Sequence, residues 1–237
     1  MPNPYFHFKQ FTIFHDKCAM KVGTDGVLLG AWTNTENAGS ILDIGTGTGL
    51  IALMLAQKCL ATIDAVEIDE NACIQAAENI ANCPWKNRIT LVKSSIQEYS
   101  EDCGKKYDLI VSNPPFFQNA FLPENRSRVM ARHNNSLQLD ELISCSQILL
   151  NNKGKLSVII PFDLFVYCQR LLNDRLLHMH RILYIKPVPA KGIIRVMIEA
   201  GFEKRAIAEQ TLVIEKGGRH DYTQEYIELT KDYYLAF

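Results

Sequence analysis

The stretch Ser40-Ile41-Leu42-Asp43-Ile44-Gly45-Thr46-Gly47-Thr48-Gly49 decides the fold of this chain. Its first half is mostly apolar and predicts a buried strand, and its second half has a glycine at every other position. Because glycine lacks a Cβ atom, the backbone of this loop can pass close to a ligand. The next segment, Leu50 to Lys58, has the composition of a helix. A strand, a glycine loop and a helix in this order predict the first unit of an α/β sheet with a ligand site at the strand end.

Strands and helices alternate along the rest of the chain. Strands are expected at 40–44, 62–68, 89–92, 107–112, 155–160, 178–185, 193–200 and 211–215, and helices at 27–32, 50–58, 69–82, 137–150, 162–176 and 224–234. Residues 5–14 predict a short strand or hairpin, and residues 151–154 are typical of a helix C-cap. The pattern predicts a doubly wound, mainly parallel α/β sheet whose final strands can pair antiparallel. Because no repeat or long linker divides residues 1–237, we expect a single domain.

The composition is that of an ordinary globular protein, with 47% apolar and 22% charged residues. No apolar run approaches the roughly 20 residues needed to cross a bilayer, and the N-terminus lacks the pattern of a secretory signal. The seven cysteines are scattered without a Cys-x-x-Cys pair, which favours reduced thiols over a disulfide frame or a metal site. We therefore expect a cytoplasmic protein with no membrane segment, no metal and no obligatory protein partner.

Charge is balanced overall but unevenly distributed. The net charge is −1, yet residues 175–220 contain nine Lys or Arg against four Glu. Arg126, Arg128 and Arg132 add positive charge to the loop expected between 118 and 135. Such clusters can bind phosphate groups without a basic average, although a charge-rich stretch can equally be a solvated face.

Polar groups also follow the ends of three other expected strands, where open α/β sheets bind their ligands. Glu67 lies 18 residues after Gly49, where an acid would accept the hydroxyls of a ribose, and Ser94 and Ser95 follow the third strand. Asn113-Pro114-Pro115-Phe116 follows the fourth, and its prolines must end the sheet ladder. An amide, two carbonyl groups and an aromatic face there suit a planar ring with an exocyclic –NH2 group, although a plain proline loop is the alternative.

These motifs resemble those of the class I S-adenosylmethionine-dependent methyltransferases that act on amino groups. Residues 42–49 match the family's cofactor loop, and residues 66–69 match its ribose-binding strand end. The tetrapeptide at 113–116 matches the motif of those members that methylate adenine N6, guanine N2 or a glutamine amide. Within this group, segments 8–11, 21–26, 29–32, 131–133 and 222–226 resemble the bacterial enzymes that methylate N6 of adenine 37, beside the anticodon of a valine tRNA. The resemblance covers essentially the whole chain. It implies a seven-stranded Rossmann-like sheet with an antiparallel C-terminal strand, S-adenosylmethionine as cofactor, and a tRNA anticodon loop as partner.

The resemblance also implies roles for individual residues. The catalytic residues would be Asn113, Pro114 and Phe116; the cofactor would be bound by Asp43, Gly45, Gly47, Gly49, Glu67, Ile68, Ser95, Thr24 and Asn113; and the substrate would be bound by Phe116, Arg132 and His133. Residues 1–35 would form an N-terminal extension that covers the cofactor pocket. The sequence departs from the family pattern at Ser95, where Asp is frequent, and at Phe116, where Tyr is common.

Several alternatives stay open at this point. Asp43 could cap a turn, Thr24 and Asp25 could be a helix N-cap, and Arg132-His133 could be a solvated loop. The acceptor could be a guanine N2 of rRNA or a protein glutamine amide. A NAD-dependent dehydrogenase is less compatible, because its fingerprint is Gly-x-Gly-x-x-Gly and not Gly-x-Gly-x-Gly. A non-catalytic RNA-binding module would not need the cofactor loop.

Overall fold

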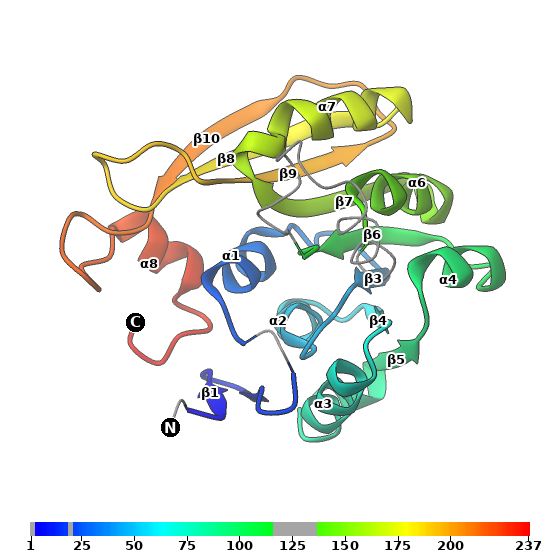
Figure 1. Cartoon of the computed structure of the whole chain (residues 1–237), viewed down its shortest axis with the longest axis horizontal. Helices are drawn as coiled ribbons and strands as arrows, with labels where there is room; N and C mark the ends of the chain where they lie inside the picture. The colour runs from blue at the N-terminus through cyan, green and yellow to red at the C-terminus, as the bar shows by residue number, and fades with distance from the viewer. Residues whose placement is uncertain (1–2, 19–20, 116–136) are drawn as a thin grey trace, which may run out of the picture.

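The computed structural model describes residues 3–18, 21–115 and 137–237, and Figure 1 shows a central twisted sheet with helices on both faces. The sheet has eight strands in the order β10-β8-β9-β7-β6-β3-β4-β5. Their bounds are β3 Ser40–Ile44, β4 Thr62–Glu67, β5 Ile89–Lys93, β6 Tyr107–Ser112, β7 Leu150–Pro161, β8 His178–Lys186, β9 Arg195–Gly201 and β10 Ala208–Val213. Since β9 alone among these strands runs antiparallel to its neighbours, the sheet is mainly parallel and the doubly wound α/β class is confirmed.

The count of seven strands and the antiparallel C-terminal strand, both implied by the resemblance, were wrong in detail, whereas each of the eight strands expected from the sequence pattern forms in the sheet. The main sheet has an eighth strand, β10, which pairs parallel with β8 at the sheet edge. The antiparallel strand is β9, which lies inside the sheet between β7 and β8. Because β9 reverses direction, it ends where β8 begins. The short connection from Gly201 to Ala208 can then carry the chain past β8, so that β10 enters the edge in the same direction as β8.

Helices cover the two faces of the sheet in separate groups. The helices are α1 Thr24–Trp32, α2 Leu50–Lys58, α3 Glu70–Ala81, α4 Ile96–Asp102, α6 Leu139–Leu149, α7 Phe165–Asp174 and α8 Gln224–Thr230. Apolar residues of α1, α2, α3 and α8 belong to the core on one face, and those of α4, α6 and α7 to the core on the other. Both faces of the parallel strands are therefore buried, as this class of sheet requires.

Strand β3 shows how the sequence sets this arrangement. Successive side chains of a strand point to opposite faces, and Ile41 packs in the first core while Leu42 and Ile44 pack in the second. Asp43 has no exposed surface and lies on the side of α2, where its carboxylate accepts the backbone N–H of Ala52 at 3.1 Å. The strand is thus buried on both faces and carries a carboxyl group to the start of the glycine loop.

The residues 151–154 do not cap a helix; they belong to β7. The pairing of β7 with β6 shifts register between Tyr107 and Leu109, and this irregularity accommodates the extra residues. An added Cβ on Gly154 would lie 2.7 Å from the carbonyl oxygen of Tyr107, so this glycine permits a close approach of two strands. Helix α4 was missed by the sequence analysis, although Ser95 and Glu98 form the reciprocal capping box that marks its start.

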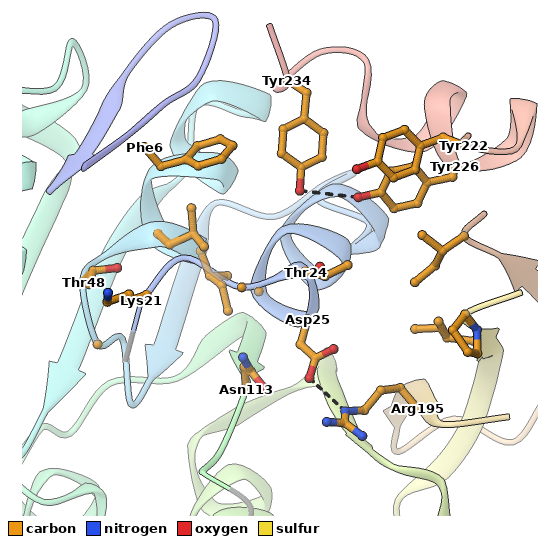
Figure 2. A pocket seen from close by; sticks show the side chains of 18 of the residues that line it. Phe6, Lys21, Thr24, Asp25, Thr48, Asn113, Arg195, Tyr222, Tyr226 and Tyr234 are labelled. Atoms are coloured by element: carbon orange, nitrogen blue, oxygen red, sulfur yellow. Dashed lines mark hydrogen bonds and ion pairs between the residues drawn. The ribbon is translucent and has the colours of Figure 1, made fainter. Parts of the chain in front are cut away.

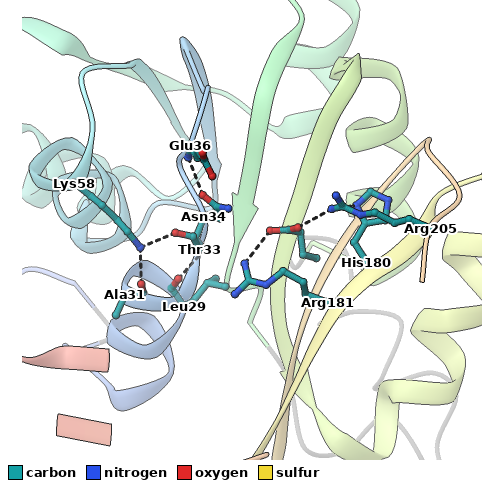
Figure 3. Close-up of polar contacts among 10 residues, drawn as sticks. Leu29, Ala31, Thr33, Asn34, Glu36, Lys58, His180, Arg181 and Arg205 are labelled. Carbon is teal, nitrogen blue, oxygen red and sulfur yellow. Dashed lines mark hydrogen bonds and ion pairs between the residues drawn. The ribbon is translucent and has the colours of Figure 1, made fainter. Parts of the chain in front are cut away.

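Helix α1 is anchored at its C-terminal end, and Figure 3 shows the polar contacts there. The ammonium group of Lys58 donates to the carbonyl oxygens of Ala31 at 2.6 Å and Thr33 at 2.7 Å, and burial lowers the pKa of Lys58 to about 8. The guanidinium of Arg181 lies 4.4 Å from the ring centre of Trp32 and also pairs with the buried Glu199 at 3.2 Å. These contacts fix α1 against the sheet, so the opposite end of α1 is held in place over the glycine loop.

The N-terminal hairpin and the C-terminus meet beside α1. Strands β1 (Tyr5–His7) and β2 (Thr12–Phe14) pair antiparallel, which confirms the expected hairpin. Phe8 forms a bridge with Tyr234, and the Lys9 side chain donates to the carbonyl oxygen of Phe237 at 2.5 Å. Within the ranges that the structure describes, no helix combines the length and apolar character needed to span a membrane.

Candidate active site

A cavity of about 1210 Å³ opens at the carboxyl ends of β3 and β6 (Figure 2). Its lining includes Gly45 to Thr48 of the glycine loop, Gly23 to Gly26 at the start of α1, Asn113 and Pro114 after β6, and residues of the C-terminal segment. Figure 2 shows Asn113 and Asp25 at one end of the cavity and a group of tyrosines at the other, with Thr24 between them. The strand ends thus place the predicted cofactor loop and the Asn-Pro-Pro turn in one cavity.

The glycine loop has the backbone conformation that its glycines were expected to provide. Gly45 and Gly47 have φ of 69° and 58°, and an added Cβ on either would meet no described atom within 4 Å. The loop is tied to β4, because the N–H groups of Gly45 and Thr46 both donate to the carbonyl oxygen of Val66 at 2.9 and 3.1 Å. The positive φ values therefore favour glycine at these two positions, and the space beside the loop is open to a ligand.

Glu67 holds the ends of two strands together. Its Oε1 accepts the N–H groups of Ile68 and Asp69, both at 2.9 Å, and its Oε2 accepts the N–H of Gly47 at 2.8 Å. A carboxylate offers about four acceptor positions, so these three bonds leave one of them on Oε2 for a ligand hydroxyl. A second hydroxyl would have to replace the N–H of Gly47. Ile68 itself is 54% exposed.

Asp43 lies behind the glycine loop with an incomplete set of partners. Its Oδ2 accepts the hydroxyl of Thr46 at 2.6 Å and the N–H of Ala52 at 3.1 Å, while Oδ1 has no hydrogen-bond partner among the described residues. Burial raises the pKa of Asp43 to about 7, and the nearby charge of Glu67 also raises it. The hydrogen bond to Thr46 agrees with the turn-capping interpretation, but it leaves the second oxygen unexplained.

Asn113 lies beside α1, with its amide in the cavity lining. Ser112 donates its hydroxyl to the carbonyl oxygen of Ile44 at 2.8 Å, which joins the end of β6 to the start of the glycine loop. The amide of Asn113 makes no hydrogen bond with the residues that the structure describes, and its Nδ2 lies 3.9 Å from the Cβ position of Gly26. A half-buried amide held next to a cofactor-type loop is thus available for an external ligand.

Asp25 is paired with a residue that the sequence analysis did not single out as functional. The Nε of Arg195, at the start of β9, lies 2.8 Å from Oδ2 of Asp25, and both side chains line the cavity. The N-cap of α1 is Gly23, without a side-chain cap bond, so the interpretation of Thr24 and Asp25 as a helix N-cap was wrong. No local pattern could reveal the pair, because its members lie 170 residues apart in the chain.

The far end of the cavity is lined by aromatic residues of the C-terminal segment. Tyr222, Tyr226, Tyr234 and Phe237 lie there, close to the exposed Arg219. In the sequence, segment 222–226 shows only a family resemblance, and no local pattern indicates a role for these rings. Their grouping depends on the packing of α8 against α1, which places the C-terminal segment in the same cavity as the glycine loop.

The predicted site residues fall into three groups. Thr24, Gly45, Gly47, Asn113 and Pro114 line the cavity, together with much of the expected N-terminal extension. Asp43, Gly49, Glu67, Ile68 and Ser95 do not appear in its lining; Gly49 is the N-cap of α2, and Ser95 is the N-cap of α4. Phe116, Arg132 and His133 lie outside the described residues, as do Arg126 and Arg128.

A Rossmann-like sheet with one antiparallel strand and a glycine loop after the first of its parallel strands is the architecture of class I methyltransferases, and the comparisons agree with it. A family model described as "Methyltransferase small domain" matches residues 18–182. The chain therefore belongs to the methyltransferase small domain family. This membership excludes the NAD-dependent dehydrogenase.

Curated relatives match the chain along its full length. A protein of Parabacteroides distasonis is 46% identical over 99% of both chains, and one of Trichodesmium erythraeum is 48% identical over 98% of both; each is named tRNA1(Val) (adenine(37)-N6)-methyltransferase. Among solved structures, a predicted O-methyltransferase of Agrobacterium tumefaciens has a TM-score of 0.69 at 17% identity, covering 88% of this chain and 96% of its own. At that identity the structural match supports the fold alone.

Proposed function

We propose that this protein transfers a methyl group from S-adenosylmethionine to N6 of adenine 37, beside the anticodon, in tRNA1(Val). The observation that carries the proposal is that one cavity contains the glycine loop, Pro114 and the amide of Asn113, which has no hydrogen-bond partner among the described residues. The names of the full-length relatives support the same acceptor. Because tRNA is a cytoplasmic molecule, the proposal includes a cytoplasmic location.

The residues around the glycine loop fit the proposed cofactor. The open backbone at Gly45 and Gly47 would accommodate its body, and the remaining acceptor position on Glu67 would take a ribose hydroxyl. Oδ1 of Asp43 has no hydrogen-bond partner among the described residues and lies behind the glycine loop, so it would accept from the amino group of the methionine part through water. When bound, S-adenosylmethionine supplies an electrophilic methyl group on a positively charged sulfur. Binding by Thr24, Gly49, Ile68 and Ser95 stays a prediction.

The chain's own contribution to the reaction is to hold the acceptor amine. Oδ1 of Asn113 and the carbonyl oxygen of Pro114 would each accept one N–H of the adenine amino group. These two bonds would draw the nitrogen lone pair out of conjugation with the ring and direct it toward the glycine loop. Transfer of the methyl group, with cleavage of its bond to sulfur, would make this nitrogen positively charged; one of its protons would then be released to water, while Asn113 and Pro114 keep the amine oriented. No strong base is needed, because positioning of the amine supplies most of the rate.

Phe116 would hold the flipped base by stacking, a role that stays a prediction since the residue lies outside the described ranges. Removing the base from its stack costs a few kcal/mol, and less in a single-stranded loop. The contacts of Arg132 and His133 with the substrate also stay predictions, because both residues lie outside the described ranges. A turn built by Pro114 and Pro115 would keep the Asn113 amide rigid while the base enters, since both residues have fixed φ.

The proposal is tested by incubating the protein with unmodified valine tRNA and labelled S-adenosylmethionine, followed by nucleoside mass analysis. We expect N6-methyladenosine in the anticodon-loop fragment, and none in a matched transcript with guanine at position 37. Label in guanine N2, or transfer only to a polypeptide, would instead support the alternative acceptors and contradict the proposal.

A further inference from the structure

The cavity exceeds the space that one small ligand needs. Small-molecule pockets usually measure about 300–1,000 Å³, and this cavity measures about 1210 Å³. The glycine loop and Asn113 account for one end of it. The other end, which we call the aromatic lobe, is lined by Tyr222, Tyr226, Tyr234, Phe237 and Arg219 and has no part in the chemistry described above.

The rings of the aromatic lobe support one another. Tyr222 and Tyr226 stack with ring centres 4.9 Å apart and an interplanar angle of 20°, and Phe237 meets the edges of both. Tyr226 is 3% exposed, whereas Tyr222 is partly exposed and lines the cavity. Figure 2 shows this stacked pair beside Tyr234, with the hydroxyl groups of Tyr226 and Tyr234 directed toward each other. Tyr222 is therefore a ring fixed from behind, with part of its surface open to the cavity.

Positive charge lies at the rim of this lobe. The guanidinium of Arg219 is exposed and makes no hydrogen bond or ion pair with any residue in the described ranges. Next to it, His220 has a φ of 66°, and its Nδ1 lies 3.0 Å from the hydroxyl of Tyr222. The main-chain N–H of His220 is held by Glu215 at 2.8 Å. The turn is thus fixed by side chains that keep Tyr222 in place, and it leaves Arg219 available to an anion.

We propose that the aromatic lobe binds an unpaired nucleotide next to the target adenine, with the base stacked on Tyr222 and a phosphate at Arg219. This inference rests on the proposed function, because it concerns the same RNA substrate. A fixed aromatic ring beside an unpaired arginine is the combination that binds single-stranded nucleic acid, where each base offers a π-face and each linkage a negative charge. The lobe shares one cavity with Asn113, so a base there belongs to the strand that presents the adenine.

The lobe therefore supplies a second contact that a free nucleoside lacks. An adenine alone would occupy only the Asn113 end, and its affinity would depend on that end. An anticodon loop would reach both ends, because its bases on either side of the target are unpaired and can unstack. Selection of the loop over other adenines then comes partly from Tyr222 and Arg219, which lie at the opposite end of the cavity from Asn113.

The first test compares variants of Tyr222 with an anticodon stem-loop as substrate. Tyr222→Ala should raise the KM for the stem-loop about tenfold and leave kcat within about twofold, since a stacked base contributes to binding. Tyr222→Phe should behave as the wild type, because it keeps the ring. Tyr167→Ala, which removes a 48% exposed tyrosine on α7, is the matched control and should change neither parameter. Calorimetry with S-adenosylhomocysteine should give equal affinity for all four proteins.

The second test uses the charge and the RNA. Arg219→Ala should reduce the slope of log K against log salt by about 0.7, the value for one lost phosphate contact on a single strand. Arg170→Ala, on the exposed face of α7, is its control and should leave the slope unchanged. Removing the base of the stacked nucleotide from the stem-loop should weaken binding to the wild-type protein. The same abasic stem-loop should bind Tyr222→Ala as well as the intact stem-loop does, because the RNA change and the protein change remove the same contact.

If Tyr222→Ala does not fold, 2-aminopurine placed at either neighbour of the target adenine replaces the variant. Quenching of one of the two probes on binding the wild-type protein, beyond that in the free loop, is the expected result. Absence of quenching at both positions, or a KM of Tyr222→Ala within twofold of the wild type, would overturn the aromatic lobe while wild-type methylation of tRNA persists. Failure of the wild type to methylate tRNA would instead overturn the proposed function itself.

Discussion

The unusual position of Asp43 gives a prediction with a calculable size. Its carboxyl group is fully buried, one oxygen has no partner in the described part of the chain, and burial raises its pKa from 3.8 to about 7. The folded state therefore binds a proton between pH 4 and pH 7 that the unfolded chain has already released. Stability from this group is present at low pH and is lost as the pH rises toward 7.

The magnitude follows from the two pKa values. Each pH unit between them corresponds to about 1.36 kcal/mol, so ionised Asp43 costs the folded state on the order of 4 kcal/mol once the pH exceeds both values. Of this amount, roughly 2.5 kcal/mol is lost between pH 5 and pH 8. Asp43→Asn removes the titration but keeps an oxygen that can accept from Thr46 and Ala52. We expect the free energy of unfolding of Asp43→Asn, minus that of the wild type, to increase by roughly 2.5 kcal/mol from pH 5 to pH 8.

Urea unfolding followed by tryptophan fluorescence at half-unit pH steps measures this difference directly, because other titrating groups cancel between the two proteins. Asp163→Asn, which removes an exposed carboxylate on the surface, is the matched control. Curves for wild type and Asp43→Asn that stay parallel from pH 5 to pH 8 would refute the reasoning, since they would mean that Asp43 is ionised throughout the range.

Three further predictions concern the site and its support. Asn113→Ala should lower kcat for methyl transfer about a hundredfold or more while the affinity for S-adenosylhomocysteine stays the same, and near wild-type turnover would remove the role given to this amide. Glu67→Ala should weaken that affinity at least tenfold in calorimetry, because the variant loses a charged acceptor; equal binding would show that the ribose is held elsewhere. Gly30→Ala should reduce the free energy of unfolding by about 1–3 kcal/mol, because its Cβ would lie 2.7 Å from Sδ of Met54. Gly192→Ala is the control and should leave the free energy of unfolding unchanged, because its Cβ would meet no described atom within 4 Å.

The local structure of the half proposed to bind the cofactor could be predicted, because its signals are local. Residues 40–49 contain the strand, the loop and the conformational reason for the glycines within ten positions, and the structure has β3 at the expected bounds. Residues 107–112 likewise form β6 as expected, directly before Asn113. In both places an apolar run ends at residues that cannot continue a strand, so the boundary is determined by neighbours in the sequence.

The misses have a different physical origin. Gly154 carries a turn signal in the sequence, but the close approach of Tyr107 on β6 decides that it lies in a strand. Helix α4 had a readable signal in Ser95 and Glu98, which was not recognised because Ser95 was interpreted only as a cofactor contact. The hydroxyl of Ser95 donates to Glu98 at 2.8 Å, so any contact with a cofactor would compete with the helix cap.

The two halves of the cavity also differ in how they are held together. The glycine loop is held by hydrogen bonds to adjacent strands of one sheet, whereas the substrate half is assembled from α1, the start of β9 and the C-terminal segment. Helix α1 connects the halves: Lys58 holds its C-terminal end, Asp25 at its other end pairs with Arg195, and α8 packs on its side. Arg195 lies 170 residues after Asp25, and α8 follows α1 from the other end of the chain, so the substrate half depends on long-range tertiary contacts. Under the proposed function, selectivity for the RNA would depend on tertiary contacts that no short motif encodes, whereas cofactor binding would depend on a loop that a short motif encodes.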